Sequence, residues 1–317
     1  MRILAIETSH DDTSICLFED GRVLDLQTIS QIDIFKEFGG TIPEISSREH
    51  VKNINLILEI FLKKYDLNTL DYVVYTKEPG LVGTLQIGFL FASAIALTFN
   101  KPLLPINHLE GHFYSCAIEN EIKYPALCLL VSGGHTQLML VNNPFDIKII
   151  GQTLDDAVGE AFDKVSARLG LGFPGGPIID KIYQKYGGEY IKFTEPHTDN
   201  IFDFSFSGLK SQVINFYHNK LQKGEEIDAN QVAASFEECA VSYLISKTKL
   251  ALENNPNIQT LVLAGGVSAN SELRKRFLAL SDKAIIPPLK YATDNGAMIA
   301  SCAYQQLIFN KLKKQKE

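Results

Sequence analysis

The fold class that the sequence predicts is α/β, with two related lobes. The chain has 317 residues, which exceeds the usual size of one domain and suggests two. The pattern strand, polar loop, strand opens the chain and recurs after the hydrophilic segment 119–123. The two halves therefore share a weak repeat in pattern, although not in identity. Duplicated lobes of this kind favour ligand binding in the cleft between them.

The first half alternates strands with helices. Short apolar runs bounded by polar residues predict strands over residues 3–6, 14–18, 23–29, 72–76 and 102–106. Ser46 is expected to cap a helix that runs to about Lys64. Residues 79–100 carry no charge and are long enough to span a bilayer, but they include several glycine, hydroxyl and amide residues. We interpret them as a loop followed by a helix over 84–99, buried between the sheet and its neighbours.

The second half starts the pattern again. Strands are expected over residues 126–131, 137–141, 147–151 and 261–264. We expect residues 1–120 to form an N-terminal lobe with the histidine helix, and residues 121–317 a C-terminal lobe with the glycine loops. The sequence leaves open whether the last helix packs back onto the first lobe.

Composition limits the class of protein. The net charge of −7 argues against a chain held to nucleic acid by overall charge, while leaving room for a local basic patch or a site shared with a partner. The N-terminus runs directly into a strand pattern, unlike a signal peptide. The cysteines are odd in number, scattered and without a C-x-x-C pair, which indicates a reducing cytoplasm and small buried side chains: Cys16, Cys116, Cys128, Cys239 and Cys302.

Two histidines four residues apart, His108 and His112, fall on one face of a predicted helix. Both imidazoles could reach one metal ion, or they could simply pack there. Glu110 does not have the position of the general base in the protease pattern H-E-x-x-H. Asp294 heads an apolar helix near the end of the chain, as either its N-cap or a carboxylate ligand. Two histidines and one carboxylate would leave open positions on a metal, as substrate binding requires.

The second half contains two glycine-rich loops, and each of them follows a predicted strand. In residues 132–137, glycines allow backbone N–H groups to approach an anion, although an ordinary hairpin has the same pattern. Residues 263–270 join a strand to a helix, where a nucleoside or phosphate can approach the helix N-terminus. The alternative there is a tight turn with Ser271 as the helix cap.

Three further segments combine groups suited to ligands. Between the first two strands, Thr8, Ser9 and Asp11 could hold a phosphate or a bridging cation, or form a solvated hairpin tip. Asp163 could accept hydrogen bonds from a ribose or be a surface acid, and residues 173–177 form a rigid turn that could lie under a ligand. Residues 203–210 alternate aromatic and small polar side chains and suggest no role by themselves.

Taken together, these segments resemble the TsaD family, the catalytic subunit of tRNA threonylcarbamoyladenosine synthesis. The resemblance runs from residues 3–9 through residues 293–300, with the histidine segment, both glycine loops and the 203–210 motif in order. It implies an α/β fold like that of actin and the sugar kinases, with two ribonuclease-H-like lobes and an inter-lobe cleft.

The resemblance also implies ligands. One divalent metal per subunit, iron(II) first and zinc(II) as the alternative, would be held by His108, His112 and Asp294. Threonylcarbamoyl-adenylate would be held by Leu130, Val131, Ser132, Gly133, Gly134, Asp163, Gly176, Asp180 and Asn270. The sequence assigns no catalytic residue.

The implied reaction transfers the threonylcarbamoyl group to N6 of the adenosine next to the anticodon, in tRNAs that read codons beginning with A, and releases AMP. The implied partners are tRNA through its anticodon loop, a paralogous TsaB-like subunit and a TsaE-like ATPase, with no membrane. Competing functions are an ATP-dependent small-molecule kinase of the same superfamily, a non-catalytic scaffold paralogue and a metalloprotease.

The chain departs from the family's usual residues at positions that are not ligands. His10 stands where cysteine is common and Asp12 where glutamate is common. Asn107 replaces a frequent histidine, 77–78 interrupt a run of small residues, and Ala292 replaces a cysteine. The charged pair at 77–78 places the contact with tRNA or a partner in question.

Overall fold

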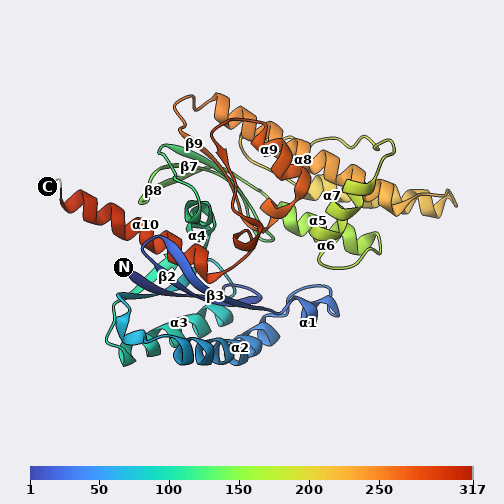
Figure 1. Cartoon of the computed structure of the whole chain (residues 1–317). Helices are drawn as coiled ribbons and strands as arrows, with labels where there is room; N and C mark the ends of the chain where they lie inside the picture. The colour runs from blue at the N-terminus through green and yellow to red at the C-terminus, as the bar shows by residue number, and fades with distance from the viewer. Residues whose placement is uncertain (316–317) are drawn as a thin grey trace. The chain divides into compact units, whose positions relative to one another are not determined.

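The computed structural model describes residues 1–315, which form two compact units (Figure 1). Unit 1 comprises Met1–Glu121 together with the segment that begins at Pro287, and unit 2 comprises Ile122–Ile286. The last helix, for which the sequence left packing onto the first lobe open, therefore belongs to unit 1. The reason is packing: α10 (Gly296–Lys314) lies against the strands and the histidine helix of unit 1.

A five-stranded sheet forms the centre of unit 1, in the order β3-β2-β1-β4-β5. The first three strands are antiparallel neighbours, while β4 and β5 run parallel to β1. Residues 3–6 of β1 are fully buried, as expected of a central strand covered on both faces. The strands are β1 (Arg2–Glu7), β2 (Asp12–Glu19), β3 (Arg22–Ser30), β4 (Tyr72–Glu78) and β5 (Leu103–Asn107).

Helices cover both faces of this sheet. In Figure 1, α2 and α3 lie side by side on one face, and α10 crosses the other. The remaining helices are short. The helices of unit 1 are α1 (Ile32–Lys36), α2 (Pro43–Lys64), η1 (Leu67–Thr69), α3 (Val82–Thr98), α4 (His108–Ser115), η2 (Cys116–Ile118), η4 (Leu289–Tyr291) and α10.

Two expectations about these helices are wrong. Ser46 does not cap α2, which begins one turn earlier at Pro43; its hydroxyl instead donates to the carbonyl of His10 (2.6 Å). The helix expected to be buried between the sheet and its neighbours, α3, is buried along one side only. Leu90 and Leu97 on its other side are 59% and 82% exposed. An uncharged helix can thus leave a broad apolar face uncovered in the isolated chain.

Unit 2 repeats the topology of unit 1. Its sheet has the order β10-β9-β6-β7-β8, with β6–β8 antiparallel and β9 and β10 parallel to β6. The order of the first three, fourth and fifth strands is therefore the same in both sheets, as in a duplicated ribonuclease-H-like core. The strands are β6 (Ala126–Val131), β7 (Thr136–Asn143), β8 (Asp146–Gln152), β9 (Thr260–Ala264) and β10 (Ala284–Ile285).

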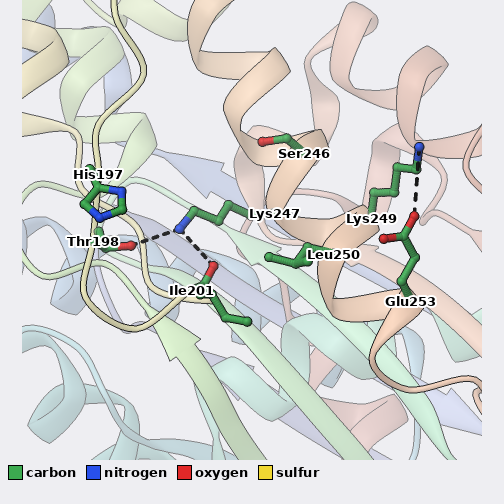
Figure 2. A pocket seen from close by; sticks show the side chains of 8 residues that line it. All are labelled: His197, Thr198, Ile201, Ser246, Lys247, Lys249, Leu250 and Glu253. Atoms are coloured by element: carbon green, nitrogen blue, oxygen red, sulfur yellow. Dashed lines mark hydrogen bonds and ion pairs between the residues drawn. The ribbon is translucent and has the colours of Figure 1, made fainter.

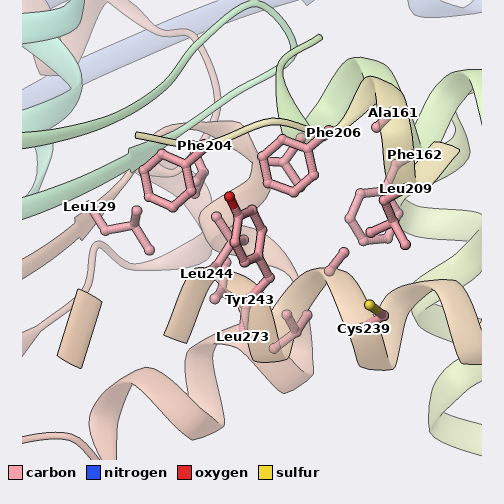
Figure 3. Packing of buried hydrophobic residues seen from close by; sticks show 14 of the residues in the cluster. Leu129, Ala161, Phe162, Phe204, Phe206, Leu209, Cys239, Tyr243, Leu244 and Leu273 are labelled. Atoms are coloured by element: carbon pink, nitrogen blue, oxygen red, sulfur yellow. The ribbon is translucent and has the colours of Figure 1, made fainter. Parts of the chain in front are cut away.

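The core of unit 2 explains the motif at 203–210. Phe204 and Phe206 are fully buried and pack edge-on against Tyr243 of α8 (Figure 3). The hydroxyl of Ser205, between them, donates to the Asp155 carboxylate (2.5 Å), which also accepts from the backbone N–H groups of Phe206 and Ser207 (2.7 and 3.1 Å). The motif is therefore an aromatic anchor for a helix start. The helices of unit 2 are α5 (Val158–Arg168), α6 (Gly175–Lys185), α7 (Ser207–Gln222), α8 (Ala229–Glu253), η3 (Gly266–Ala269) and α9 (Ser271–Leu278).

Two simpler expectations agree with the structure. All five cysteines are free and buried, as the scattered pattern predicted. Among the described residues, no helix combines the length and apolarity that crossing a bilayer requires.

Candidate metal centre and glycine loops

Three ligand-type side chains of unit 1 converge at one point. The Asp294 Oδ1 atom lies 3.1 Å from His112 Nε2 and 3.6 Å from His108 Nε2. Metal–ligand bonds of about 2.1 Å place neighbouring ligand atoms roughly 3.0–3.5 Å apart, so this spacing suits a shared ion. His112 is fully buried, and in the described part of the chain neither of its ring nitrogens makes a regular hydrogen bond. A buried imidazole left in this way is expected where a metal completes the site.

The local sequence explains how α4, which carries the two histidines, and α10, which follows Asp294, come so close together. Asn107, the departure from the family's histidine, caps α4: its side chain accepts from the N–H groups of Leu109 and Glu110 (2.9 and 3.2 Å). Gly111, between the two histidines, faces α10. A Cβ there would lie 2.8 Å from Ile299 Cδ1, so glycine permits the close approach of α4 and α10.

Asp294 is free to act as a ligand because its neighbour caps the helix. The Asn295 side chain accepts from Met298 N (3.0 Å), so Asn295 is the N-cap of α10. Gly296 N donates to Ser14 Oγ (2.9 Å), and a Cβ on Gly296 would lie 2.8 Å from Cys16 N. The start of α10 is thus fixed on β2. Of the two roles that the sequence left open for Asp294, the cap is excluded.

Charges at the centre stabilise one another. Burial acts to lower the pKa of His108, but the carboxylates of Asp294 and Glu7 outweigh it and raise that pKa to about 9. Burial acts to raise the pKa of Asp294, yet the charge of His108 and the contact with His112 hold it well below its usual range. A carboxylate that stays ionised is the form a metal requires.

The loop between β1 and β2 packs inward. Thr8 and Ser9 are 1% exposed, and the Thr8 hydroxyl donates to the carbonyl of Thr84 (2.9 Å). As placed, Thr8 faces the interior and has no hydroxyl to offer a phosphate. Asp11 contacts the ring of His10 (2.9 Å), and the carbonyl of His10 is held by α2. The side chains of Thr8 and Asp11 thus contact the protein itself, whereas the buried Ser9 hydroxyl makes no hydrogen bond among the described residues.

The corresponding loop of unit 2, between β6 and β7, is open. Ser132 and His135 close it, through Ser132 N to the His135 carbonyl (2.8 Å) and His135 N to Ser132 Oγ (3.0 Å). Gly133 and Gly134 are exposed, and nothing lies within 4 Å of a Cβ built on either. The segment is therefore a hairpin whose exposed backbone could also bind an anion, so the two interpretations of residues 132–137 do not exclude each other. Leu130 and Val131 are fully buried, so only their backbone could contact a ligand.

Other backbone segments pack tightly around this loop. A Cβ on Gly159 would lie 2.6 Å from the Ser132 carbonyl oxygen, and one on Gly265 would lie 2.3 Å from the Val131 carbonyl oxygen. Gly265 also has a φ of 88°, which glycine adopts without strain. The glycines after β9 thus allow contact between two loops of the same unit.

Three of the remaining residues predicted to bind the adenylate form hydrogen bonds with the first residues of α6 or α9. Asp163 Oδ1 accepts from Gly175 N (2.6 Å), and the Asp180 carboxylate accepts from the hydroxyl of Ser271 (2.8 Å). Asn270, rather than the expected Ser271, is the cap of α9 and accepts from Leu273 N (2.8 Å). Gly176 has open space where a Cβ would lie.

Sequence reasoning missed one residue of this group, Glu237. It is fully buried in α8 and accepts from the Asn270 side-chain amide (2.9 Å). Burial raises the pKa of Glu237 to about 8, and the nearby Asp180 acts in the same direction. Glu237 therefore stays largely protonated near neutral pH. No local signal could have found it, since it lies within an ordinary helical pattern.

Two surface hollows of unit 2 contain none of the predicted residues. One, of about 450 Å³, lies between the 197–201 loop and α8 (Figure 2). The Lys247 amine is used there, donating to Thr198 Oγ1 and the Ile201 carbonyl (both 2.9 Å). The other, of about 600 Å³, lies along residues 188–195 and α8.

Fold and site together define a class: an actin-like α/β protein of two duplicated ribonuclease-H-like units, with a cluster of metal-ligand type in the first and glycine loops in the second. The (R)-2-hydroxyglutaryl-CoA dehydratase component A of Acidaminococcus fermentans has this fold. It superposes with a TM-score of 0.58 at 14% identity, over 96% of this chain and 97% of that one.

The family follows from sequence comparison. The model of the family "TsaD: tRNA N6-adenosine threonylcarbamoyltransferase" matches residues 22–301. The chain is 76% identical over 307 residues to the tRNA N6-adenosine threonylcarbamoyltransferase of Mycoplasmopsis agalactiae, covering 97% of this chain and 99% of that one. It is 60% identical to the Mycoplasmopsis synoviae enzyme of the same name, with the same coverage. The chain belongs to the TsaD family.

Proposed function

We propose that this chain transfers the threonylcarbamoyl group from threonylcarbamoyl-adenylate to N6 of the adenosine next to the anticodon, in tRNAs that read codons beginning with A. AMP is the leaving group. The observation that carries the proposal is the family match over residues 22–301 combined with an intact cluster of His108, His112 and Asp294. The single-stranded anticodon loop can present its base for such an attack.

His108, His112 and Asp294 would hold one divalent metal, iron(II) first and zinc(II) as the alternative. The imidazole nitrogens of His112 without regular hydrogen bonds support this assignment. When bound, the metal would act as a Lewis acid and orient the threonylcarbamoyl moiety. The chain itself keeps Asp294 ionised and fixes the start of α10, so the ligands are held in place beforehand.

The loops of unit 2 would hold the adenylate. Backbone N–H groups at Gly133 and Gly134 are accessible and can donate to the phosphate as negative charge moves toward the leaving group. The predicted set is Leu130, Val131, Ser132, Gly133, Gly134, Asp163, Gly176, Asp180 and Asn270. Leu130 and Val131 would act through their backbone, because their side chains are buried. Thr8, Ser9 and Asp11 would support the site from within unit 1 rather than bind phosphate.

Partner proteins would complete the tRNA-binding surface. With a net charge of −7, the chain alone should bind tRNA weakly. We propose a TsaB-like subunit and a TsaE-like ATPase as partners, in the cytoplasm. The exposed apolar side of α3, with Leu90 and Leu97, supports a subunit contact on unit 1.

The competing functions have less support. A metalloprotease would need Glu110 beside the histidines, but its carboxylate accepts from Gln306 of α10 (2.9 Å). A degenerate scaffold would lack metal ligands, and all three residues are present. A kinase has no use for the histidine–aspartate cluster.

Reconstitution with labelled threonine tests the proposal. The assay contains this chain, an adenylate-forming enzyme, the bacterial partners, ATP, bicarbonate and unmodified tRNA. We expect label in tRNA with the wild type and with His218→Ala, a change at an exposed histidine of α7, and a loss of at least about 100-fold with His112→Ala. Absence of label throughout, with partners active on a reference enzyme, would favour a scaffold or kinase. Equal label in all would keep the reaction and reject the metal assignment.

A further inference from the structure

A second carboxylate lies behind the metal-type cluster, and neither the sequence nor the family resemblance gave it a role. Glu7, the last residue of β1, is fully buried. Its Oε2 atom lies 3.2 Å from Nδ1 of His108. The opposite ring nitrogen of His108, Nε2, is the one near Asp294. Glu7 therefore contacts the far side of the imidazole from the candidate metal position.

All three polar partners of Glu7 can donate to it. Ser9 N donates to Oε1 (2.5 Å), the Thr76 hydroxyl donates to Oε2, and His108 Nδ1 faces the same Oε2. A carboxylate without a proton accepts all three bonds.

An ionised Glu7 has a consequence for the histidine. Because the carboxylate can only accept, His108 Nδ1 must carry a proton, and in the neutral ring Nε2 then has the free lone pair. That lone pair faces Asp294, where a metal would be coordinated. A partner of this kind also raises the basicity of the ligating nitrogen and fixes the plane of the ring.

We propose that Glu7 is a positioning residue of the metal centre, which fixes the tautomer and orientation of His108. The inference rests on the proposed metal site and deepens it. It gives the segment 7–9 a different role from the phosphate loop that the sequence suggested: Glu7 orients the ligand, while the backbone of Ser9 and the hydroxyl of Thr76 hold Glu7.

Glu7→Gln is the sharpest variant because it keeps the shape and removes the ability to accept at both atoms. With its amide nitrogen at the Oε1 position, the side chain would place two donors against each other at Ser9 N. With the nitrogen at the Oε2 position, it would donate to His108 Nδ1 and force the proton onto Nε2, the wrong tautomer for a ligand.

Glu110→Gln is the matched control. Glu110 lies on α4 between the two histidines, but its carboxylate contacts Gln306 and not the imidazoles. Both changes remove one negative charge from the same region of unit 1, so the loss of charge alone should change metal affinity by a similar amount in the two variants. Only Glu7→Gln alters the contact with His108.

The experiment measures zinc affinity of the full-length chain by competition with a chromophoric chelator, at fixed pH. We expect one zinc per wild-type chain, binding about 10–100-fold weaker in Glu7→Gln, and no more than about a twofold change in Glu110→Gln. Equal affinity of Glu7→Gln and wild type would overturn the role of Glu7 while leaving the metal centre in place. A wild type that binds no zinc would overturn the metal centre and this inference with it.

A measurement on the wild type covers the case in which Glu7→Gln fails to fold. In zinc-loaded protein with ¹⁵N-labelled histidine, we expect His108 to have a protonated Nδ1 and a metal-bound Nε2. The reverse assignment, with the metal on Nδ1, would exclude the proposed contact with Glu7.

Discussion

The loops at residues 8–11 and 132–135 have the same place in two sheets of the same topology, yet they differ in which groups they expose. In unit 1 the loop residues after β1 are packed inward, with Thr8 bonded to Thr84. In unit 2 the loop after β6 exposes Gly133 and Gly134. The duplicated fold therefore packs the side chains of one loop inward and leaves the backbone of the other accessible. Topology fixes where a site can form, and the residue types at that place decide its chemistry.

Among the described residues, one fully buried glutamate in each unit, Glu7 and Glu237, shows a similar contrast. Glu7 has three donors around it, and its pKa lies below the ordinary value. Glu237 has one donor, Asn270, with Asp180 nearby, and burial raises its pKa to about 8. Equal burial thus gives an ionised acid in unit 1 and a largely protonated one in unit 2, because the neighbours and not the depth decide.

The largest effect on stability is expected at Gly265, where the backbone lies close to the backbone of Val131. Gly265→Ala combines a positive φ with a Cβ 2.3 Å from the Val131 carbonyl oxygen, so we expect a loss of roughly 3–5 kcal/mol of unfolding free energy. Gly266→Ala, with open space around it, should change stability by less than about 1 kcal/mol. Denaturant unfolding of both variants checks this. Similar losses in the two would show that the loop contact in unit 2 is not tight.

The protonated state of Glu237 predicts a pH effect. Between about pH 4.5 and pH 8 the unfolded chain releases this proton while the folded chain keeps it, so the folded state loses stability as pH rises through that window. Glu237→Gln cannot titrate and still accepts from Asn270. Its stability relative to wild type should rise by on the order of 1–3 kcal/mol from pH 5 to pH 8.

The control for this pH effect is Glu226→Gln, at an exposed position. Thermal unfolding across the pH series should give parallel curves for this variant and wild type. A Glu237→Gln curve that also runs parallel to wild type would mean that the acid is ionised in the folded state.

Gly88 of unit 1 tests whether the side chain of Thr8 is packed tightly in the loop after β1. A Cβ on Gly88 would lie 2.3 Å from Thr8 Oγ1, the end of a side chain rather than backbone. We expect Gly88→Ala to cost about 1–2 kcal/mol. Adding Thr8→Ala should remove the conflict, so the double variant should be more stable than the sum of the single changes by about 1 kcal/mol. Strict additivity in denaturant unfolding would contradict this packing.

The smallest effect on stability is expected at Gly133, in the open loop. Gly133→Ala has space for its methyl group and should alter unfolding by no more than about 0.5 kcal/mol. If the loop holds the adenylate phosphate, the same methyl group should weaken AMP binding about tenfold, or about 1.4 kcal/mol. Calorimetric titration with AMP measures this. Unchanged AMP affinity would remove Gly133 from the proposed site.

Local patterns predicted the strands well and long-range contacts poorly. Residues 126–131 form one uninterrupted apolar run, and they are a buried strand. The start of α2 was missed because Ser46 bonds to the carbonyl of His10, a residue far away in sequence. For the last helix the sequence left packing onto the first lobe open, because its contacts are with residues far away in sequence. Glu7 and Glu237 have roles set by tertiary neighbours, which no spacing in the sequence reveals.

The return of the chain from Pro287 to unit 1 has a consequence for synthesis. His108 and His112 emerge from the ribosome early, whereas Asp294 follows about 180 residues later, which corresponds to roughly 10–40 s of translation. During that interval unit 2, a continuous segment, is complete, but β1 and β2 still lack α10. Unit 1 is therefore completed only after the unit inserted in its sequence, and a chain truncated before Pro287 would keep two histidines without their carboxylate partner.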